Sequence, residues 1–406
     1  MTVIDLRPHV RAGDGVWWGQ AGAEAIPLVD VLLDQVADIG PVRAFSGLTY
    51  NRRLRSVPEQ LTLVSYGAMG ELRRARGLEI VPAHYSVLPR LFAEHTLPGD
   101  VGLVQVAPPG PDGVCSFGIG VDFAADAARH SRVLIGEINH RMPATTGTPG
   151  IRLDRFAATI ETDRPLPEAP DRQPDAVDEA IAARVAELVE DGDTVQMGVG
   201  ALPSAIMDGL AAHRDLGFHS GMLTDGVLRL VEKGVLTGRH KEIDEGLLVT
   251  GTAIGSAELY ARLGELPVVF KPASYTHDPA VLARLRRLVA INSAIEVDLG
   301  GQVGSEVAGG RYLGGIGGQA DFSGAAARTG ARSIIALRSI AGGASTIVPV
   351  LGGPVSTARA DVDAVVTEHG VAWLRGCPLP EIGRRLVTVA GPEHRDELER
   401  TLWEES

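Results

Sequence analysis

Cysteine, aromatic residues and metal-binding patterns are scarce in this chain. Its 406 residues include only two cysteines, Cys115 and Cys377. A chain of this length buries a core that folds without disulfides, so no disulfide framework is expected. No His-Glu-x-x-His segment and no close pair of cysteines occurs, which predicts no metal site. Aromatic residues form 4 % of the chain, too few for an extended base-stacking surface.

Positive charge and long apolar runs are also lacking. The 38 basic and 51 acidic residues give a net charge of −13, which disfavours binding to nucleic acid or anionic lipid. The first residues do not show a basic stretch followed by an apolar one, so no signal peptide is expected. No apolar run reaches the ~18 residues of a membrane-spanning helix. These absences predict a cytoplasmic globular enzyme without nucleic-acid or membrane partners.

Short apolar runs alternate with amphipathic stretches along the chain. The runs are rich in Val, Ile and Leu without strict alternation, which is typical of strands buried on both faces. Such alternation of strands and helices predicts an α/β protein with mainly parallel sheets. The expected strands are 61–66, 101–106, 133–138, 194–198, 247–251, 267–271, 288–292, 333–337, 364–367 and 386–390, and the clearest helices are 176–190, 203–212 and 225–233.

A proline-rich stretch separates two halves of related layout. Residues 161–175 hold four prolines among charged residues, which favours an extended connector. We therefore expect an N-terminal α/β domain over 1–165, a linker over 166–175 and a C-terminal α/β domain over 176–406. The stretch 192–195 echoes 13–17, since each is a glycine turn followed by a buried strand.

Glycine is abundant, at 50 residues, and two glycine segments could carry chemistry. In residues 198–205, Gly198, Gly200 and Pro203 lie between an expected strand and an expected helix. The free amides of such a turn attract an anion, with Pro203 suited to the first helical position. The third glycine of a dinucleotide fingerprint and the Gly-Lys-Ser/Thr of a P-loop are missing. An ordinary strand–helix turn is the alternative.

The second glycine segment covers residues 314–322. Its four glycines leave backbone amides bare, so the loop can donate hydrogen bonds to a carbonyl oxygen that gains negative charge. A flexible surface loop is the alternative, although Ile316 inside the loop disfavours it. The candidate residues here are Gly314, Gly315, Gly317, Gly318, Gln319 and Asp321.

Three further segments contain candidate catalytic side chains. His219 or Ser220 could be catalytic, but no nucleophile-elbow spacing surrounds Ser220, and the following residues favour a helix cap. His277 precedes Asp-Pro and is either a general acid/base or part of a turn. Glu296 lies among apolar residues, where its carboxylate would have a raised pKa or a partner. A structural ion pair and catalysis are equally compatible with that pattern.

Taken together, these segments resemble a known family. Their order along the chain is similar to that of the acetyl-CoA hydrolase/4-hydroxybutyrate CoA-transferase family of class I CoA-transferases. The resemblance implies two open, mainly parallel α/β domains with the active site between them, acyl-CoA as substrate, a small organic acid or water as acceptor, no covalently bound cofactor, and a homodimer. The matching segments are 104–113, 116–118, 137–143, 198–203, 216–220, 225–227, 232–235, 275–279, 291–298, 314–322 and 366–370.

The resemblance also marks two departures from the family pattern. In the family a glutamate of a His-Ser/Thr-Glu-Met element attacks the thioester, and coenzyme A then passes through a glutamyl thioester. Here that element reads His-Ser-Gly-Met, so Gly221 stands at the nucleophile position. The family's oxyanion asparagine corresponds to His277, and its glycine donor corresponds to Gly318. The other candidate residues would bind the substrate or coenzyme A. They are Gly198, Gly200, Pro203, His219, Ser220, Gly314, Gly315, Gly317, Gln319 and Asp321.

A glycine at position 221 cannot form an anhydride. The sequence therefore favours thioester hydrolysis or acyl transfer without the glutamyl intermediate, with His277 as a base for water or as an oxyanion donor. A CoA-transferase with a relocated carboxylate such as Glu296, a non-catalytic CoA-binding protein, and carbon–carbon bond chemistry on a CoA-linked diketone stay open. The phosphates of coenzyme A need local basic residues, for which Lys271, Arg311 and Arg332 are candidates, with solvated surface positions as the alternative.

Overall fold

The protein is described here by a computed structural model that covers residues 4–169 and 173–404. The chain divides into two compact units. Among the described residues, unit 1 comprises 4–169 and 249–276, and unit 2 comprises 173–248 and 277–404. The sequence predicts one uninterrupted domain over 176–406, whereas 249–276 packs with unit 1, where Ser274 hydrogen-bonds Asp126. Residues 170–172 of the predicted linker lie outside the described residues.

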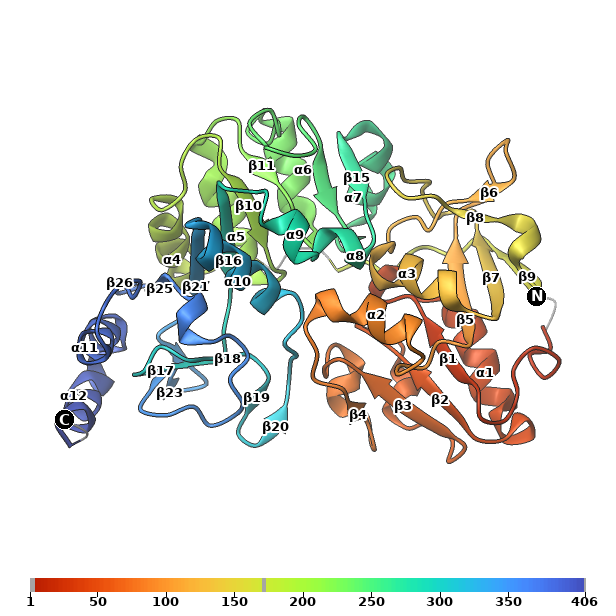
Figure 1. The fold of residues 1–406 in the computed structure, drawn as a ribbon, viewed down its shortest axis with the longest axis horizontal. Coiled ribbons are helices and arrows are strands. Elements are labelled where there is room, and N and C mark those ends of the chain that lie inside the picture. The colour runs from red at the N-terminus through yellow and green to blue at the C-terminus, as the bar shows by residue number, and fades with distance from the viewer. Residues whose placement is uncertain (1–3, 170–172, 405–406) are drawn as a thin grey trace. The chain divides into compact units, whose positions relative to one another are not determined.

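Unit 1 is built on a seven-stranded sheet in which every neighbouring pair is parallel. The strand order is β4-β3-β2-β1-β5-β7-β9, coloured red to yellow in Figure 1. The strands are β1 (Gly15–Trp18), β2 (Val42–Phe45), β3 (Leu61–Ser65), β4 (Glu79–Ile80), β5 (Val101–Val106), β7 (Val133–Asn139) and β9 (Ala158–Thr162), and the helices are α1 (Ile26–Ile39), α2 (Leu88–Ala93) and α3 (Asp122–His130).

The two faces of this sheet bury alternate residues of β1. Val16 and Trp18 belong to the apolar cluster that includes Leu28 and Leu32 of α1. Trp17 points to the other face and meets Phe92 of α2 edge-on, with 6.2 Å between ring centroids. Because neighbouring residues of a strand face opposite sides, both faces of the sheet are covered by helices, as expected for a parallel sheet.

The smaller elements of unit 1 lie outside this sheet. Strands β6 and β8 pair in antiparallel fashion. The segment 249–276, which packs with unit 1, forms short strands and two helices. The smaller elements of unit 1 are β6 (Val114–Cys115), β8 (Ile151–Arg152), β13 (Leu248–Thr250), β14 (Thr252–Ala253), α7 (Ala257–Arg262), β15 (Val268–Phe270) and α8 (Ala273–Thr276).

Unit 2 is built on a six-stranded sheet of order β11-β10-β16-β21-β25-β26. Its neighbouring strands are parallel except for the edge pair β25–β26. The strand order reverses between β10 and β16, and open α/β sheets bind ligands at the carboxyl ends of the strands at such a reversal. The strands are β10 (Thr194–Met197), β11 (Gly217–Phe218), β16 (Leu288–Asn292), β21 (Arg332–Ala336), β25 (Ala364–Thr367) and β26 (Gly370–Trp373).

Helices and small sheets surround the unit 2 sheet. The helices are α4 (Ala176–Ala186), α5 (Ala201–Gly209), α6 (Asp225–Glu232), α9 (Pro279–Leu282), α10 (Gln319–Thr329), α11 (Leu379–Val389) and α12 (Arg395–Glu404). The short strands are β12 (Met222–Leu223), β17 (Glu296–Asp298), β18 (Val303–Gly304), β19 (Val307–Ala308), β20 (Arg311–Tyr312), β22 (Ile340–Ala341), β23 (Ala344–Ser345) and β24 (Ile347–Val348). The hairpin β19–β20 leads directly into the glycine segment 314–318 and then into α10.

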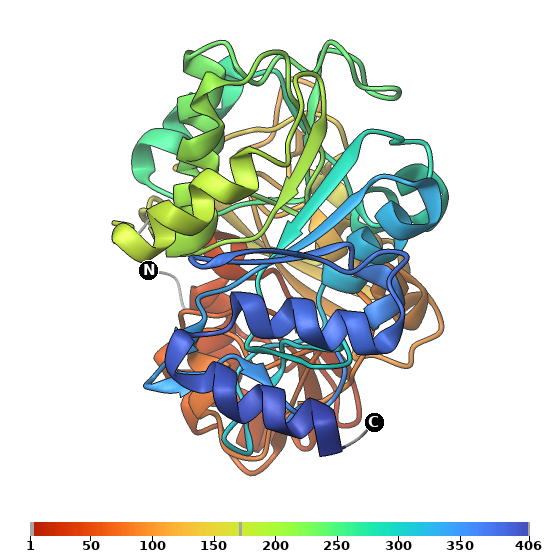
Figure 2. The same ribbon diagram turned by 90° about the vertical axis from the view of Figure 1, so that its left-hand side faces the viewer.

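One predicted strand is wrong. Residues 386–390 form the end of helix α11 rather than a strand. Leu386 and Val387 are buried together with Ile382, one turn earlier, which places them on one helical stripe. Figure 2 shows α11 and α12 in blue as neighbouring helices. The short apolar run resembled a buried strand because periodicity over so few residues does not separate the two structures.

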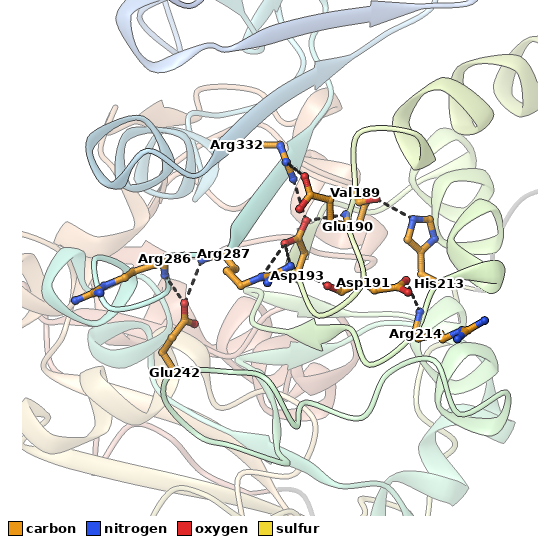
Figure 3. A network of polar contacts seen from close by, with 10 residues as sticks. All are labelled: Val189, Glu190, Asp191, Asp193, His213, Arg214, Glu242, Arg286, Arg287 and Arg332. Carbon is orange, nitrogen blue, oxygen red and sulfur yellow. Dashed lines mark hydrogen bonds and ion pairs between the residues drawn. The ribbon is translucent and has the colours of Figure 1, made fainter.

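Ion pairs join the amino ends of the unit 2 strands, as Figure 3 shows. The Asp193 carboxylate, just before β10, contacts Arg287 at 3.1 Å and Arg332 at 3.0 Å. Burial raises the pKa of Asp193, while the two guanidinium groups act in the opposite direction. Arg332 also pairs with Glu190. Arg332 therefore stabilises the amino ends of the strands. It does not lie at their carboxyl ends, where it could bind coenzyme A phosphates.

The other two basic candidates lie elsewhere. The Lys271 ammonium stacks over the Tyr275 ring at 5.3 Å from its centroid, a cation–π contact. Arg311 is exposed on β20, ahead of the glycine segment. Among the described residues, no group of three or more His, Cys, Asp or Glu side chains could hold a metal ion, and no described helix is long and apolar enough to cross a membrane.

Candidate active site

The turn after β10 has the glycine geometry that the sequence indicates. Gly200 adopts φ +133°, a conformation that side chains disfavour, and it forms the N-cap position of α5. No atom lies within 4 Å of the place where Gly198 would carry a Cβ, so the turn faces open space. Pro203 is the third residue of α5 rather than the first. It still lies in the first turn, where a missing amide hydrogen removes no helical bond.

The segment after β11 ties two strand ends together. The Ser220 hydroxyl donates to the Met197 carbonyl at 2.9 Å, and the His219 amide donates to the Val195 carbonyl at 3.1 Å. Both side chains are buried. Ser220 is thus engaged in holding the end of β10 against its neighbour. Thr224 occupies the N-cap position of α6, but its side chain makes no capping bond.

The His277 imidazole packs directly against two glycines. A Cβ atom at position 221 would lie 2.8 Å from its Cε1 and 2.9 Å from its Nε2. A Cβ atom at position 318 would lie 2.4 Å from Nε2. Phe322 of α10 meets the ring edge-on, with 5.0 Å between centroids. The ring therefore takes up space that a side chain at 221 or 318 would need, so either the ring or the added side chain would have to shift.

Burial keeps this imidazole neutral. The pKa of His277 falls to about 3, mainly because burial penalises the charged form and secondly because His219 is nearby. A base of such low pKa removes a proton from water poorly near neutral pH. A neutral imidazole can instead donate a hydrogen bond to a developing oxyanion. The neighbouring Asp278 accepts, at its Oδ1, hydrogen bonds from the amides of Ala280 and Val281 at the start of α9.

The glycine loop 314–318 is half-buried rather than a free surface loop. Gly317 needs its glycine because it adopts φ +55°, and Gly314 needs it because a Cβ would lie 2.3 Å from the Ser305 carbonyl oxygen. Gly315 lies between them in the same half-buried stretch. The loop ends where α10 begins at Gln319.

Helix α10 begins with residues that the sequence assigns to the site. Asp321 lies in its first turn, where a carboxylate interacts favourably with the helix dipole. Gly318 precedes the helix and contacts His277, as described above. The amides that start this helix are therefore next to the imidazole.

Glu296 lies outside the six-stranded sheet of unit 2. It lies on β17, in a small sheet with β18 and β24. Its Oε1 accepts from the Gly352 amide at 2.6 Å. The carboxylate thus has a backbone partner rather than the basic side chain of an ion pair, and it anchors the loop that contains Gly352.

Comparison with known proteins gives the family. Residues 255–402 match the model of the acetyl-CoA hydrolase/transferase C-terminal domain. The chain is 39 % identical over 326 residues to the 4-hydroxybutyrate coenzyme A transferase of Clostridium kluyveri, covering 79 % of this chain and 76 % of that protein. It is 32 % identical to a probable butyrate:acetyl-CoA coenzyme A-transferase of Syntrophomonas wolfei, covering 98 % and 93 %. The chain belongs to the acetyl-CoA hydrolase/transferase family.

Solved structures agree with this family. RipA from Yersinia pestis has a TM-score of 0.91 at 31 % identity, covering 98 % of this chain and 96 % of that one. The 4-hydroxybutyrate CoA-transferase of Porphyromonas gingivalis has a TM-score of 0.83 at 32 % identity, covering 98 % and 95 %. The predicted α/β class with mainly parallel sheets is confirmed. As a member of this family, the protein is an enzyme that acts on acyl-CoA, with coenzyme A as part of its substrate.

The structure of this acetyl-CoA hydrolase/transferase also contains a buried polar pair that the sequence analysis does not predict. Gln196 of β10 and Asn292 of β16 are buried and exchange two amide hydrogen bonds, of 3.2 and 3.0 Å. They lie at the strand pair where the order of the sheet reverses. Each apolar run contains one polar residue, and this could have indicated the pair. A polar side chain in a buried strand needs a hydrogen-bond partner.

Proposed function

We propose that this protein hydrolyses an acyl-CoA thioester by direct attack of water, without a covalent glutamyl intermediate. The packing of the His277 imidazole against Gly221 and Gly318 carries the proposal. Position 221 offers no carboxylate, and the space beside it holds an imidazole instead.

In direct hydrolysis, water replaces coenzyme A at the thioester carbon. The water oxygen forms a bond to the thioester carbon, and the carbonyl oxygen becomes an oxyanion. The tetrahedral centre then breaks its carbon–sulfur bond, so that coenzyme A leaves as a thiolate and the acyl group leaves as a carboxylic acid. The proton released by water ends on the thiolate or in solvent.

The residues around His277 are suited to stabilise the oxyanion. Its neutral ring can donate one hydrogen bond, and the amides that start α10 next to Gly318 can donate others. Fixed donors of this kind act on charge that develops only in the transition state, and losing one costs about 10²–10³-fold in rate. We therefore assign His277 the role of donor rather than base.

A CoA-transferase with a relocated carboxylate is the second candidate. It is favoured by the transferases among the relatives, which include the 4-hydroxybutyrate enzyme of Clostridium kluyveri. Glu296 would then have to leave the Gly352 amide before it could attack a thioester. This cost makes hydrolysis the better-supported function.

The test measures free thiol from acetyl-, butyryl-, 4-hydroxybutyryl- and succinyl-CoA, each with and without acetate. Hydrolysis predicts thiol release without acetate, and transfer predicts a new acyl-CoA only when acetate is present. Borohydride added during turnover should leave every glutamate unmodified. A reduced glutamate in the peptide map, at Glu296 or elsewhere, would overturn direct hydrolysis. Coenzyme A binding without turnover of any ester would indicate a non-catalytic binding protein.

A further inference from the structure

Both ends of the glycine loop are fastened to the same two residues, Ser305 and Glu306. At the first end, the amides of Leu313 and Gly314 donate to the Glu306 carbonyl at 2.7 and 3.1 Å. The Gly314 Cα also packs on the Ser305 carbonyl, which leaves no room for a side chain. This contact fixes where the loop begins.

At the other end, the Ser305 hydroxyl has two acceptors in reach, of which Oε1 of Gln319, at 3.2 Å, is nearer than the Ser293 carbonyl, at 3.5 Å. Gln319 is the first residue of α10 and follows Gly318 directly. One dipeptide therefore sets the distance between the two ends of a loop whose glycines have no side chains of their own to fix it.

The dipeptide is itself held firmly. The Ser305 amide donates to the Ser356 hydroxyl at 2.9 Å, and that hydroxyl donates to Oε1 of Glu306 at 2.8 Å. The Tyr312 hydroxyl donates to the other oxygen of the same carboxylate. Glu306 and Ser356 are 2 % and 5 % exposed. Burial raises the pKa of Tyr312, and its bond to Glu306 acts in the same direction, so the phenol stays a donor.

The orientation of the Gln319 amide follows from this arrangement. Because Oε1 accepts from Ser305, the Nε2 group lies at the opposite end of the planar amide. Nε2 is buried and has no hydrogen-bond partner within the described residues. A buried donor left without an acceptor is costly, and beside a loop of bare amides it suits an oxygen of a bound ligand.

We propose that Ser305 and Glu306 are positioning residues that set the glycine loop and turn the Gln319 Nε2 group toward an acyl-CoA oxygen. The second half of this proposal rests on the proposed acyl-CoA function. The first half concerns the protein without substrate. The two halves can therefore be tested separately.

Hydrogen exchange tests the first half on the full chain without ligand. In Ser305→Ala, the amides of residues 313–320 should exchange about 5- to 10-fold faster than in the wild type, the effect of losing one hydrogen bond. Ser305→Thr keeps the hydroxyl and should restore slow exchange. Ser345→Ala is the matched control, because Ser345 also donates to a nearby carbonyl, that of Ile347, without touching the loop. Equal loop exchange in the two alanine variants would overturn the positioning role.

Kinetics test the second half. Ser305→Ala should lower kcat about 5- to 10-fold, with KM changed by less than about 2-fold, because the misplaced donors act in the transition state. Gln319→Ala should lower it similarly, and the double variant should be no slower than either single one. Fully multiplicative effects would overturn the link between Ser305 and Gln319. If the wild type turned over no acyl-CoA, the proposed function would fail, while the exchange result would still decide the positioning role.

Discussion

At the residue scale, the contact between His277 and Gly221 makes the two positions dependent on each other. Gly221→Ala places a methyl group 2.8 Å from the ring, and such overpacking costs about 1–3 kcal/mol. Combining it with His277→Ala should cost less than the sum of the single changes. Urea unfolding of the four proteins measures this coupling, and simple additivity would contradict the packing described here.

The same contact predicts how a covalent route could be restored. Gly221→Glu alone should not form a glutamyl adduct, because the imidazole fills the space beside it. Gly221→Glu combined with His277→Asn recreates the pattern that the family resemblance implies and removes the obstruction. Borohydride reduction during incubation with acetyl-CoA should then trap a modified residue 221 in the double variant only. Equal trapping in the single variant would show that His277 does not block this position.

The role of His277 can be read from two substitutions. As a donor, it should be replaceable in part by asparagine, so His277→Asn should keep kcat within about 10-fold, while His277→Ala loses about 10²–10³-fold. Because its pKa is about 3, the pH–rate profile of the wild type should show no step from this residue between pH 5 and 8. A base role would instead make the two variants equally slow.

At the element scale, the short helix α9 is linked to the site through its cap. Asp278 caps α9 and is bonded in sequence to His277. Asp278→Ala should cost about 1 kcal/mol of stability and also lower kcat, because the backbone next to the imidazole loses its anchor. Asp175→Ala removes the cap of α4 and should lower stability without slowing turnover. Asp278→Asn, which can still cap, should recover both properties.

Several strands could be predicted because their residue types favour a buried strand over a helix. The runs that became β5, β16 and β25 start and end as expected, since runs dominated by β-branched and aliphatic residues suit buried parallel strands. Residues 386–390 could not be separated from a strand because the helical stripe depends on Ile382, which lies before the run. Short apolar runs carry too little periodicity for that decision.

The sequence marks the candidate site residues but not the contacts between them. The glycine segments stand out in sequence because several glycines fall within a few residues, and His277 stands out because it precedes Asp-Pro. That His277 lies against both Gly221 and Gly318 depends on packing between segments far apart in the chain. The proposed positioning role of Ser305 has no signal in the sequence for the same reason, since one serine in a loop has no local signature.

At the scale of the whole molecule, two buried groups should make the free energy of unfolding depend on pH in opposite directions. Glu24 is fully buried, accepts a hydrogen bond from Thr49 at 2.6 Å, and has its pKa raised from 4.5 to about 8, mainly by burial. Its contribution is complete below pH 4.5 and is lost as the pH rises to 8. The pKa of His277 is lowered from 6.5 to about 3, so its contribution is complete above pH 6.5 and is lost as the pH falls to 3.

The two slopes oppose each other between pH 4.5 and 6.5, where each amounts to about 1.4 kcal/mol per pH unit. Glu24→Gln should remove the loss of stability between pH 6.5 and 8, and it should expose the His277 slope at lower pH. His277→Asn should do the reverse. Urea unfolding across this pH range measures both slopes. Parallel curves for the wild type and Glu24→Gln would show that Glu24 is ionised in the folded protein.

The chain passes from one unit to the other three times, near residues 169, 248 and 276. Cutting the gene at the proline-rich stretch would therefore not yield two self-sufficient fragments. The C-terminal piece would carry residues 249–276 without the strands and helices they pack on, leaving side chains such as Leu259 and Phe270, which are now buried, open to aggregation. The last passage ends at His277 itself, so dissection at the first boundary would also disturb the residue to which we assign the oxyanion donor.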